Sequence, residues 1–415
     1  MESTPETFVV ELTTQTYGGE TLGRLPDGRA VFVPFALPGE AVRVRLVEEK
    51  KRYARAELVE VLTAAPERIT PICTHFTACG GCHYQHLSYE NQLFAKTKIL
   101  KDQLERIGGI ESPPVKPIIP SPIQFHYRNN IQFHLSKQGG LGFHRWRSKD
   151  VLAIKECHLP EETLNSLWPK LDFEQGTDLL KIGLRLGENE DVMLTLESED
   201  PEPPEFMVED LPISVVFLGP EDVHVLAGDS YVCIDMLNRS FRVSAGSFFQ
   251  VNTPMAAAMV EHVLSNLDLS QSDTVIDAYA GVGLFSAFLA PKVKRLVAIE
   301  NSPWACNDFV HNLDDFDNVE LYHARVEDVL SNLVVDPKVI LVDPPRAGLE
   351  RGTIDSILAM NPELLVYVSC DPATLARDAR RLVKGGYFLA STTPFDLFPQ
   401  TYHIEGISFW HKQSR

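Results

Sequence analysis

Cys370 has the sequence surroundings of a catalytic nucleophile. It follows Val366–Val368, whose apolar residues predict a short buried strand. Asp371 and Pro372 predict the start of a helix, because a carboxylate caps the free N–H groups and proline suits the first turn. A thiol at a helix N-terminus lies at the positive end of the helix dipole, which lowers its pKa and favours the thiolate. The alternative is a small buried apolar residue, the usual environment of a free cysteine.

Four more cysteines have the spacing of a metal site. Three of them crowd into one short segment, Cys73-x5-Cys79-Gly-Gly-Cys82, and the fourth is Cys157. Four thiolates suit either zinc or an iron–sulfur cluster. Zinc sites favour two Cys-x2-Cys pairs, and this chain has one such pair plus two outlying thiols, which favours a 4Fe–4S cluster. His83 and His86 could replace a ligand, although surface or core histidines are the more common case.

Three strand ends in the second half of the chain carry residues that suit nucleoside binding. The strand at 273–278 ends in the Gly-rich turn Tyr279-Ala-Gly-Val-Gly283, which lets a nucleoside approach the backbone. The next strand ends at Glu300, within the distance expected for a ribose contact. A later strand ends in Asp343-Pro-Pro-Arg346. The alternation of strands and helices predicts a doubly wound α/β domain, although a Gly-rich turn alone would equally suit a dinucleotide enzyme.

The N-terminal segment, from Phe8 to Leu62, predicts a small five-stranded barrel of the OB-like kind. Its apolar residues cluster or alternate as in strands, and glycines and prolines separate the strands. The basic run Lys50–Arg55 precedes the last strand. Such barrels bind single-stranded nucleic acid through basic grooves and aromatic side chains, although a solvated charge run is an equally good reading of the basic residues alone.

The middle of the chain contains one helix and two charged stretches. The apolar spacing predicts a helix over Tyr89–Ile107, with Lys96 inside the apolar arc. Arg145–Lys149 combines cations with an aromatic ring and suits either a base and phosphates or a solvated hairpin tip. Residues 188–210 contain ten acidic residues and no Lys or Arg. We expect that segment to include a loop and to lie away from any RNA surface.

Composition sets limits on the class of protein. The chain has 415 residues and a net charge of −19, which argues against simple electrostatic capture of nucleic acid but not against a local basic face. The seven unevenly placed cysteines argue against a disulfide framework. We find no apolar run that could span a membrane and no signal peptide, so we expect a soluble, cytoplasmic protein.

In combination these motifs strongly resemble the RNA 5-methyluridine methyltransferase family, and the N-terminal segment resembles a TRAM domain, an RNA-binding module. The resemblance covers nearly the whole chain, including the final motif Asp396–Glu405. It implies a doubly wound, Rossmann-like α/β catalytic domain, an N-terminal OB-like barrel and a central α+β domain. The implied boundaries are 1–65 for the TRAM barrel, 66–245 for the central domain with the iron–sulfur cysteines, and 246–415 for the methyltransferase domain.

The resemblance also implies the roles of individual residues. The implied S-adenosylmethionine-binding residues are Gln250, Tyr279, Glu300 and Asp343. The implied nucleophile is Cys370, and the implied general base is Glu405. The implied ligands of a 4Fe–4S cluster are Cys73, Cys79, Cys82 and Cys157.

The chemistry of uracil explains why a thiol and a carboxylate are needed. Carbon 5 of uracil is too weak a nucleophile to take a methyl group directly, so the Cys370 thiolate adds to carbon 6 and activates carbon 5. After methyl transfer Glu405 removes the carbon 5 proton, and elimination expels the thiolate. The target base has to be flipped out of a folded RNA. We expect a monomer that acts on ribosomal RNA; the alternatives are transfer RNA, or a non-catalytic RNA-binding or chaperone protein on a methyltransferase scaffold.

Overall fold

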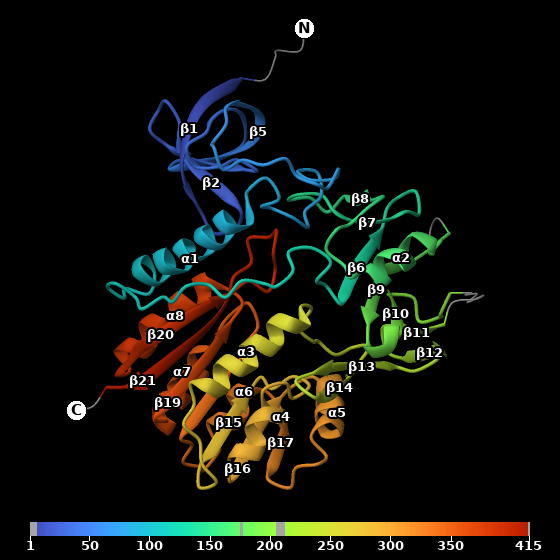
Figure 1. Ribbon diagram of the computed structural model, residues 1–415, viewed down its shortest axis with the longest axis vertical. Helices are drawn as coiled ribbons and strands as arrows, with labels where there is room; N and C mark the ends of the chain where they lie inside the picture. Colours follow the sequence, from blue (N-terminus) through green and yellow to red (C-terminus); the bar gives the residue numbers. More distant parts are fainter. Residues whose placement is uncertain (1–5, 175–176, 205–211, 414–415) are drawn as a thin grey trace.

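The computed structural model describes residues 6–174, 177–204 and 212–413 and contains a barrel and two large sheets (Figure 1). The barrel strands are β1 Thr7–Gln15, β2 Glu20–Arg24, β3 Ala30–Pro34, β4 Ala41–Glu49 and β5 Tyr53–Thr63. They close in the order β1-β2-β3-β5-β4, which confirms the predicted five-stranded barrel. Alternate residues such as Val10, Val31 and Val42 point inward and form its core. Gly18 and Gly19 make the turn between β1 and β2 with φ of 97° and 82°.

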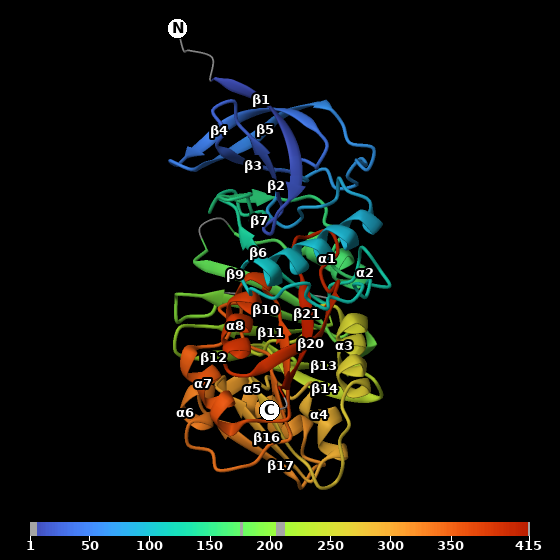
Figure 2. The same ribbon diagram turned by 90° about the vertical axis from the view of Figure 1, so that its left-hand side faces the viewer.

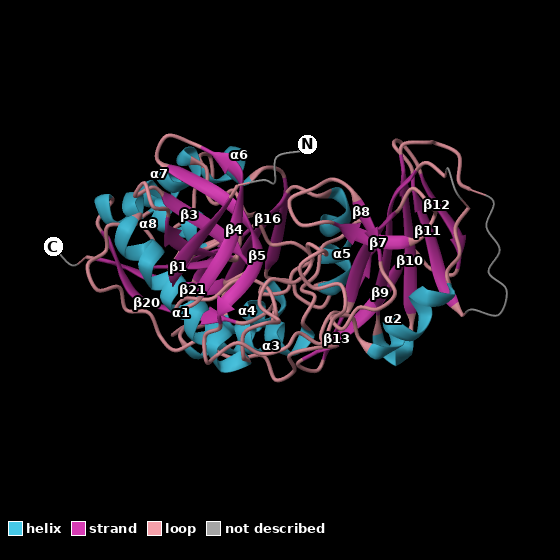
Figure 3. Ribbon diagram, turned by 90° about the horizontal axis from the view of Figure 1, so that it is seen from above, coloured by secondary structure: helices cyan, strands magenta, loops and turns pink. Residues whose placement is uncertain are grey.

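A seven-stranded central sheet follows, in the order β12-β11-β10-β9-β6-β7-β8. Its strands are β6 Asn130–Leu135, β7 Leu141–His144, β8 Val151–Ala153, β9 Leu179–Leu186, β10 Val192–Ser198, β11 Ile213–Leu218 and β12 Val223–Ala227. The same part of the chain contains the helix α2 Glu162–Leu167, the 3-10 turns η1 Trp168–Lys170 and η2 Glu188–Glu190, and the hairpin β13 Tyr231–Met236 and β14 Arg239–Ser244. Figure 3, seen from above, shows β9–β12 on one side of the molecule and β20 and β21 on the other.

The acidic segment 188–210 contains regular structure as well as the predicted loop. Within it, β10 lies inside the central sheet, antiparallel to β9 and parallel to β11. The strand forms because Val192, Met193, Leu194 and Leu196 are all buried there. The chain then bends at 199–202, while residues 205–210 lie outside the described ranges. Apart from Glu197, which lies within β10, the acidic residues in the described part of this segment therefore flank a buried strand.

The catalytic sheet has seven strands in the order β17-β16-β15-β18-β19-β21-β20. These strands are β15 Thr274–Ala278, β16 Arg295–Glu300, β17 Val319–His323, β18 Val339–Val342, β19 Leu364–Ser369, β20 Tyr387–Phe395 and β21 Glu405–Lys412. The first five are parallel to one another, and β21 is antiparallel to both β19 and β20. The carboxyl ends of the parallel strands therefore share one edge, where ligands bind in open α/β sheets.

Helices cover both faces of the catalytic sheet, which confirms the doubly wound prediction (Figure 2). One apolar cluster contains α3 Thr253–Ser265, α4 Ser286–Leu289 and α5 Pro303–Asn312, and the 3-10 turn η3 Ala290–Lys292 follows α4. The opposite cluster contains α6 Val326–Leu330, α7 Arg351–Met360 and α8 Pro372–Lys384. Within the described ranges no helix is both long enough and apolar enough to span a membrane.

The helix α1 Tyr89–Arg106 confirms the predicted helix and connects two parts of the molecule. Its residues Ile99, Leu100 and Leu104 join the apolar cluster of α6, α7 and α8, so α1 packs on the catalytic sheet although it precedes the central sheet in the chain. In Figures 1 and 2 it lies beside α8 and below the barrel. Lys96 is fully buried on this helix, which goes further than the predicted burial of its aliphatic stem.

Candidate active site

The strand and helix predicted around Cys370 are both present. β19 ends at Ser369, and α8 begins at Pro372 with Asp371 as its N-cap. One carboxylate oxygen of Asp371 accepts hydrogen bonds of 2.9 Å from the backbone N–H groups of Ala373 and Thr374. Cys370 is therefore fixed between a fully buried strand and a capped helix, at the carboxyl edge of the sheet.

The register of the sheet sets Cys370 opposite Glu405. Ser369 of β19 pairs with Gly406 of β21, and in an antiparallel pair the next partners are Cys370 and Glu405. Glu405 is buried, with 5% of its surface exposed. Because the two residues are far apart in the sequence, only the β19–β21 pairing brings them together.

The predicted low pKa of the Cys370 thiol is wrong. Burial raises its pKa to about 12, and the negative charges of Glu405 and Asp343 act in the same direction, while Arg346 opposes them. Burial and Asp343 likewise raise the pKa of Glu405 to about 8, and burial and Asp277 raise that of Asp343 to about 7. The helix dipole is outweighed because two carboxyls share the same poorly hydrated site. The thiol and these carboxyls therefore form one coupled acid–base group.

Three of the predicted cofactor residues meet at the carboxyl edge of adjacent strands. Tyr279 follows β15 with φ of 65°, Glu300 ends β16, and Asp343 follows β18. The Glu300 carboxylate accepts hydrogen bonds from Gly281 N at 2.9 Å and from Asn301 N and Ser302 N at 2.7 Å. Glu300 thus stabilises the Gly-rich turn as well as facing the edge where a nucleoside would lie.

Gln250 and the Gly-rich turn are positioned by close packing. Gln250 is buried in the segment before α3, where its carbonyl accepts a hydrogen bond of 3.1 Å from the Asn129 side chain. Gly283 has φ of 93°, and a Cβ there would lie 2.3 Å from Leu313 and 3.0 Å from Phe309. Only glycine fits that position, because larger residues would clash with α5 and its C-terminal end.

The four predicted ligand cysteines line one cavity of about 580 Å³ (Cys73, Cys79, Cys82 and Cys157). Gly80 lets their loop approach β7 closely: its N–H donates to His144 O at 2.9 Å, and a Cβ would lie 2.9 Å from the same oxygen. Burial raises the pKa of Cys157 to about 12, as expected for a thiol without a cation. In the described part of the chain, no group of His, Cys, Asp and Glu side chains is arranged as ligands of a metal ion.

The two histidines considered as alternative ligands belong to the core. His83 and His86 are buried, and neither lines the cysteine cavity. The ring of His83 packs 4.8 Å from Trp146 and 4.5 Å from Tyr402, and that of His86 packs 5.4 Å from Phe76. His83 and His86 are therefore core histidines, the more common of the two alternatives, and not replacement ligands.

The basic stretch Arg145–Lys149 is partly used for contacts within the protein. Arg147 pairs with Glu20 of the barrel at 2.8 Å, and the Trp146 ring packs 5.5 Å from Phe35. These two residues connect the segment between β7 and β8 to the barrel, so they are poor candidates for RNA contacts. Arg145 and Lys149 remain exposed.

The basic run Lys50–Arg55 is similarly divided. Arg55 pairs with Glu20 at 2.6 Å, and Lys50 pairs with Glu48 at 3.2 Å. Lys51 and Arg52 are exposed. Surface pairs of this kind leave the local positive charge small, so the barrel offers only a few free cations.

Sequence reasoning missed several residues near Cys370. Tyr17, in the barrel turn, donates a hydrogen bond of 2.9 Å to Asp371, and its ring packs 5.6 Å from Tyr402. Arg346 was noted only as part of a motif, but its charge acts on both Cys370 and Glu405. The only sequence signal for the role of Tyr17 was its position beside the Gly-Gly turn. The sequence did not indicate which part of the chain Tyr17 would contact.

Comparisons with known proteins agree with this architecture. Residues 229–413 match the family described as tRNA (Uracil-5-)-methyltransferase, and residues 5–59 match the TRAM domain. An uncharacterized RNA methyltransferase of Chlorobaculum tepidum is 32% identical over 97% of this chain and 96% of its own. One from Aquifex aeolicus is 36% identical over 94% and 95%.

A solved structure is similar over the whole chain. It is the Pyrococcus abyssi tRNA (uracil-54, C5)-methyltransferase in complex with S-adenosyl-L-homocysteine. It is 26% identical, covers 97% of this chain and 100% of its own, and aligns with a TM-score of 0.74. The likeness therefore extends across the barrel, the central sheet and the catalytic sheet.

Proposed function

Because the chain belongs to the RNA (uracil-5-)-methyltransferase family, whose members use S-adenosylmethionine, we propose that it methylates carbon 5 of a uridine through a covalent bond to Cys370. The observation that carries this proposal is the register of β19 and β21: Ser369 pairs with Gly406, so Cys370 and Glu405 are the next residues on the two strands. Addition requires a nucleophile at carbon 6 and elimination requires a base at carbon 5, so both groups have to reach the same base ring.

Each residue then has a defined task. The Cys370 thiol first releases its proton to solvent, the thiolate sulfur then adds to carbon 6 of the flipped uracil, and the electron pair of the 5,6 double bond becomes available at carbon 5. S-adenosylmethionine supplies the methyl group that carbon 5 takes. Glu405 removes the carbon 5 proton, the double bond re-forms, and the thiolate leaves. A base with a pKa near 8 is well matched to this proton transfer at physiological pH.

The cofactor residues in this proposal are Gln250, Tyr279, Glu300 and Asp343. Their support is the common edge formed by the ends of β15, β16 and β18. We assign the ribose hydroxyls to Glu300, because a carboxylate at the end of the second strand is the usual ribose acceptor. We also propose the division into segments 1–65, 66–245 and 246–415. Its support is the presence of a barrel, a central sheet and a catalytic sheet.

We further propose that the four cysteines (Cys73, Cys79, Cys82 and Cys157) bind a 4Fe–4S cluster. The support for this proposal is that all four thiols line one cavity, together with the uneven spacing of the cysteines in the sequence. Nothing in uracil methylation needs an electron, so the cluster would stabilise the central domain or support RNA binding.

The RNA class has two candidates. Ribosomal RNA is the prediction from the sequence. Transfer RNA is favoured by the description of the matched family and by the activity named for the Pyrococcus abyssi enzyme. The deciding experiment supplies unmodified ribosomal RNA and unmodified transfer RNA separately, with a labelled methyl donor, and maps the modified base. Label at carbon 5 of a uridine supports the proposal, and label on cytosine or a purine contradicts it.

A further inference from the structure

The residues Asp396–Ile404, here called the C-terminal loop, connect β20 to Glu405, the proposed base. The loop begins directly after β20 and ends directly before Glu405, the first residue of β21. In Figures 1 and 2 it rises from the catalytic sheet toward the barrel and the start of α1. Its conformation therefore depends on parts of the chain outside the catalytic sheet.

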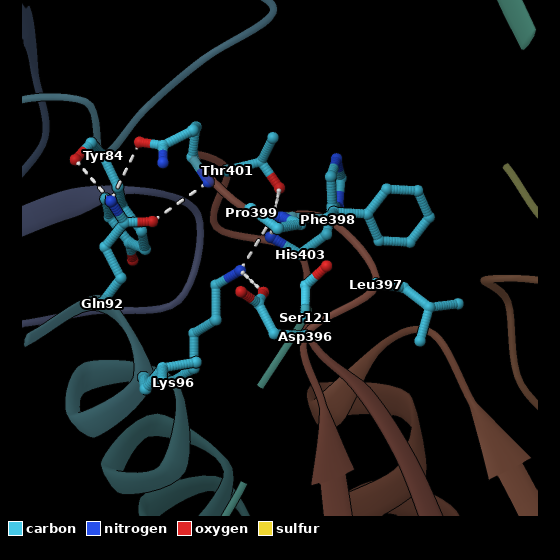
Figure 4. Close-up of polar contacts among 12 residues, drawn as sticks. Tyr84, Gln92, Lys96, Ser121, Asp396, Leu397, Phe398, Pro399, Thr401 and His403 are labelled. Carbon is cyan, nitrogen blue, oxygen red and sulfur yellow. Dashed lines mark hydrogen bonds and ion pairs between the residues drawn. The ribbon is translucent and has the colours of Figure 1, made fainter. Parts of the chain in front are cut away.

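A buried ion pair fixes the first half of the C-terminal loop to α1. The Lys96 ammonium lies 2.5 Å from an Asp396 carboxylate oxygen, and neither side chain is exposed. The same ammonium donates a hydrogen bond of 3.0 Å to Phe398 O. Figure 4 shows Lys96 extending from its helix to this turn of the loop. Lys96 thus determines the direction in which the chain leaves β20.

A pair of glutamine side chains fixes the second half. Gln92 Nε2 donates to Gln400 Oε1 at 2.9 Å, and Gln400 N donates to Gln92 Oε1 at 3.0 Å. The Gln92 amide also donates to Leu87 O at 2.9 Å, so its own position is set by the chain before α1. Gln400 has φ of 68°, a left-handed conformation that a non-glycine residue keeps only when its surroundings require it.

The loop that carries Cys82 makes a third contact. The backbone N–H groups of His83 and Tyr84 both donate to Gln400 O, at 2.8 and 3.0 Å. The Tyr127 hydroxyl donates to Pro399 O at 3.2 Å. The segment before Glu405 is thus bound on three sides by groups that precede the catalytic domain in the chain.

We propose that Lys96 and Gln92 are positioning residues, which hold the C-terminal loop so that Glu405 faces Cys370 during elimination. This inference rests on the proposed function, because it concerns the same base. A nine-residue loop without such contacts would lose its single conformation, because the conformational entropy lost on ordering each residue opposes folding.

The chemistry of the Lys96–Asp396 pair supports this role. A buried ion pair contributes little net stability compared with apolar residues of the same volume, but it requires one defined arrangement of its partners. Lys96 is also close enough to Glu405 for its charge to oppose the rise in the pKa of that carboxyl, a rise caused by burial and Asp343. The groups whose charges act on Glu405 are Asp343, Arg346 and Lys96.

Loss of these contacts should impair one step only. Addition of the Cys370 sulfur and the methyl transfer need no base at carbon 5. Elimination does: the proton goes to Glu405, its electron pair re-forms the double bond, and the carbon 6–sulfur bond breaks. A displaced Glu405 therefore leaves a methylated covalent adduct that forms normally and decays slowly.

The test uses Lys96→Met/Asp396→Asn, which removes both buried charges together, and Gln92→Met. The control is Lys98→Met, an exposed lysine on the same helix. Single-turnover experiments with labelled methyl donor and RNA measure adduct formation and adduct decay separately. We expect formation within twofold of wild type and decay at least tenfold slower in both test variants, with the control unchanged. Glu405→Gln, measured alongside, should retain the adduct.

The remaining outcomes of these experiments contradict either the inference or the proposed base, or leave Gln92→Met to decide. Wild-type decay in the two test variants overturns the inference, as does equal slowing of formation and decay, which indicates general damage. If the double variant does not fold, Gln92→Met decides; if neither folds, the contacts are structural and the inference is wrong. If Glu405→Gln forms no lasting adduct, the proposed base is wrong, whatever the positioning variants do.

Discussion

The hydroxyl of Tyr17, in the turn of the N-terminal barrel, donates a hydrogen bond of 2.9 Å to Asp371, the residue that follows Cys370. The other carboxylate oxygen of Asp371 caps α8. The barrel thus makes a hydrogen bond to the segment between β19 and α8, which contains the nucleophile. A module expected only to bind RNA therefore also contacts the segment that carries Cys370.

Tyr17→Phe should lower kcat/KM for RNA methylation without unfolding the protein. The substitution removes one hydrogen bond worth about 1 kcal/mol, or about fivefold in rate. Steady-state kinetics on the RNA substrate provide the measurement. Tyr231→Phe is the control, since its ring packs on Arg242 in the β13–β14 hairpin. Unchanged kinetics in Tyr17→Phe would mean that the contact has no part in catalysis.

Cys370→Ala should abolish methyl transfer and all covalent attachment to RNA, whereas Glu405→Gln should accumulate a methylated adduct. The glutamine cannot take the carbon 5 proton, so elimination stops after methylation. Denaturing electrophoresis with labelled RNA detects the adduct. RNA containing 5-fluorouracil should trap the wild-type protein in the same way, because fluorine cannot leave as a cation. Methylation by Cys370→Ala would refute the covalent mechanism.

Glu300→Ala should weaken S-adenosylmethionine binding by roughly 1–3 kcal/mol, the value of a lost charge-assisted hydrogen bond. Titration calorimetry measures the affinity. Because Glu300 also accepts a hydrogen bond from Gly281 N, Glu300→Gln should fall between wild type and alanine. Glu320→Ala, which removes a surface pair with Arg295, is the control. An unchanged affinity in Glu300→Ala would assign the ribose to another residue.

Protein purified without oxygen should be brown and contain about four irons per chain, the stoichiometry of one cluster. Cys157→Ala should lose the iron and the colour but still bind S-adenosylmethionine, because Tyr279, Glu300 and Asp343 lie at the edge of the other sheet. Cys233→Ser is the matched control, since Cys233 lies on β13 and does not line the cysteine cavity. A colourless, active preparation with stoichiometric zinc would contradict the cluster.

The buried carboxyls predict that the free energy of unfolding falls as the pH rises from about 5 to about 8. Burial raises the pKa of Glu405 to about 8 and that of Asp277 to about 7, whereas unfolded carboxyls titrate near about 4. The folded protein keeps protons that the unfolded chain has released, so this stabilisation is complete at low pH and is lost through pH 7–8. Urea midpoints at several pH values should show a smaller decline in Glu405→Gln. An identical decline would show that Glu405 does not titrate in this range.

The sequence was sufficient for features that depend on neighbouring residues. The Asp371-Pro372 helix start, the Gly-rich turn and the barrel strands follow from capping, backbone freedom and residue periodicity, and all three are present. The order of the motifs along the chain was enough to identify the family. None of these inferences needed to know which distant segments touch.

Only the tertiary structure decided the properties that depend on burial and on distant partners. The sequence predicted a low pKa for Cys370 from the helix dipole, but burial beside Glu405 and Asp343 raises it. The sequence placed Lys96 inside the apolar arc of its helix but did not indicate its partner Asp396, which lies 300 residues away. Periodicity reports which face of an element is apolar, but it cannot report what packs there. Charge interactions in a poorly hydrated site depend on that packing, so they emerge only when the chain has folded.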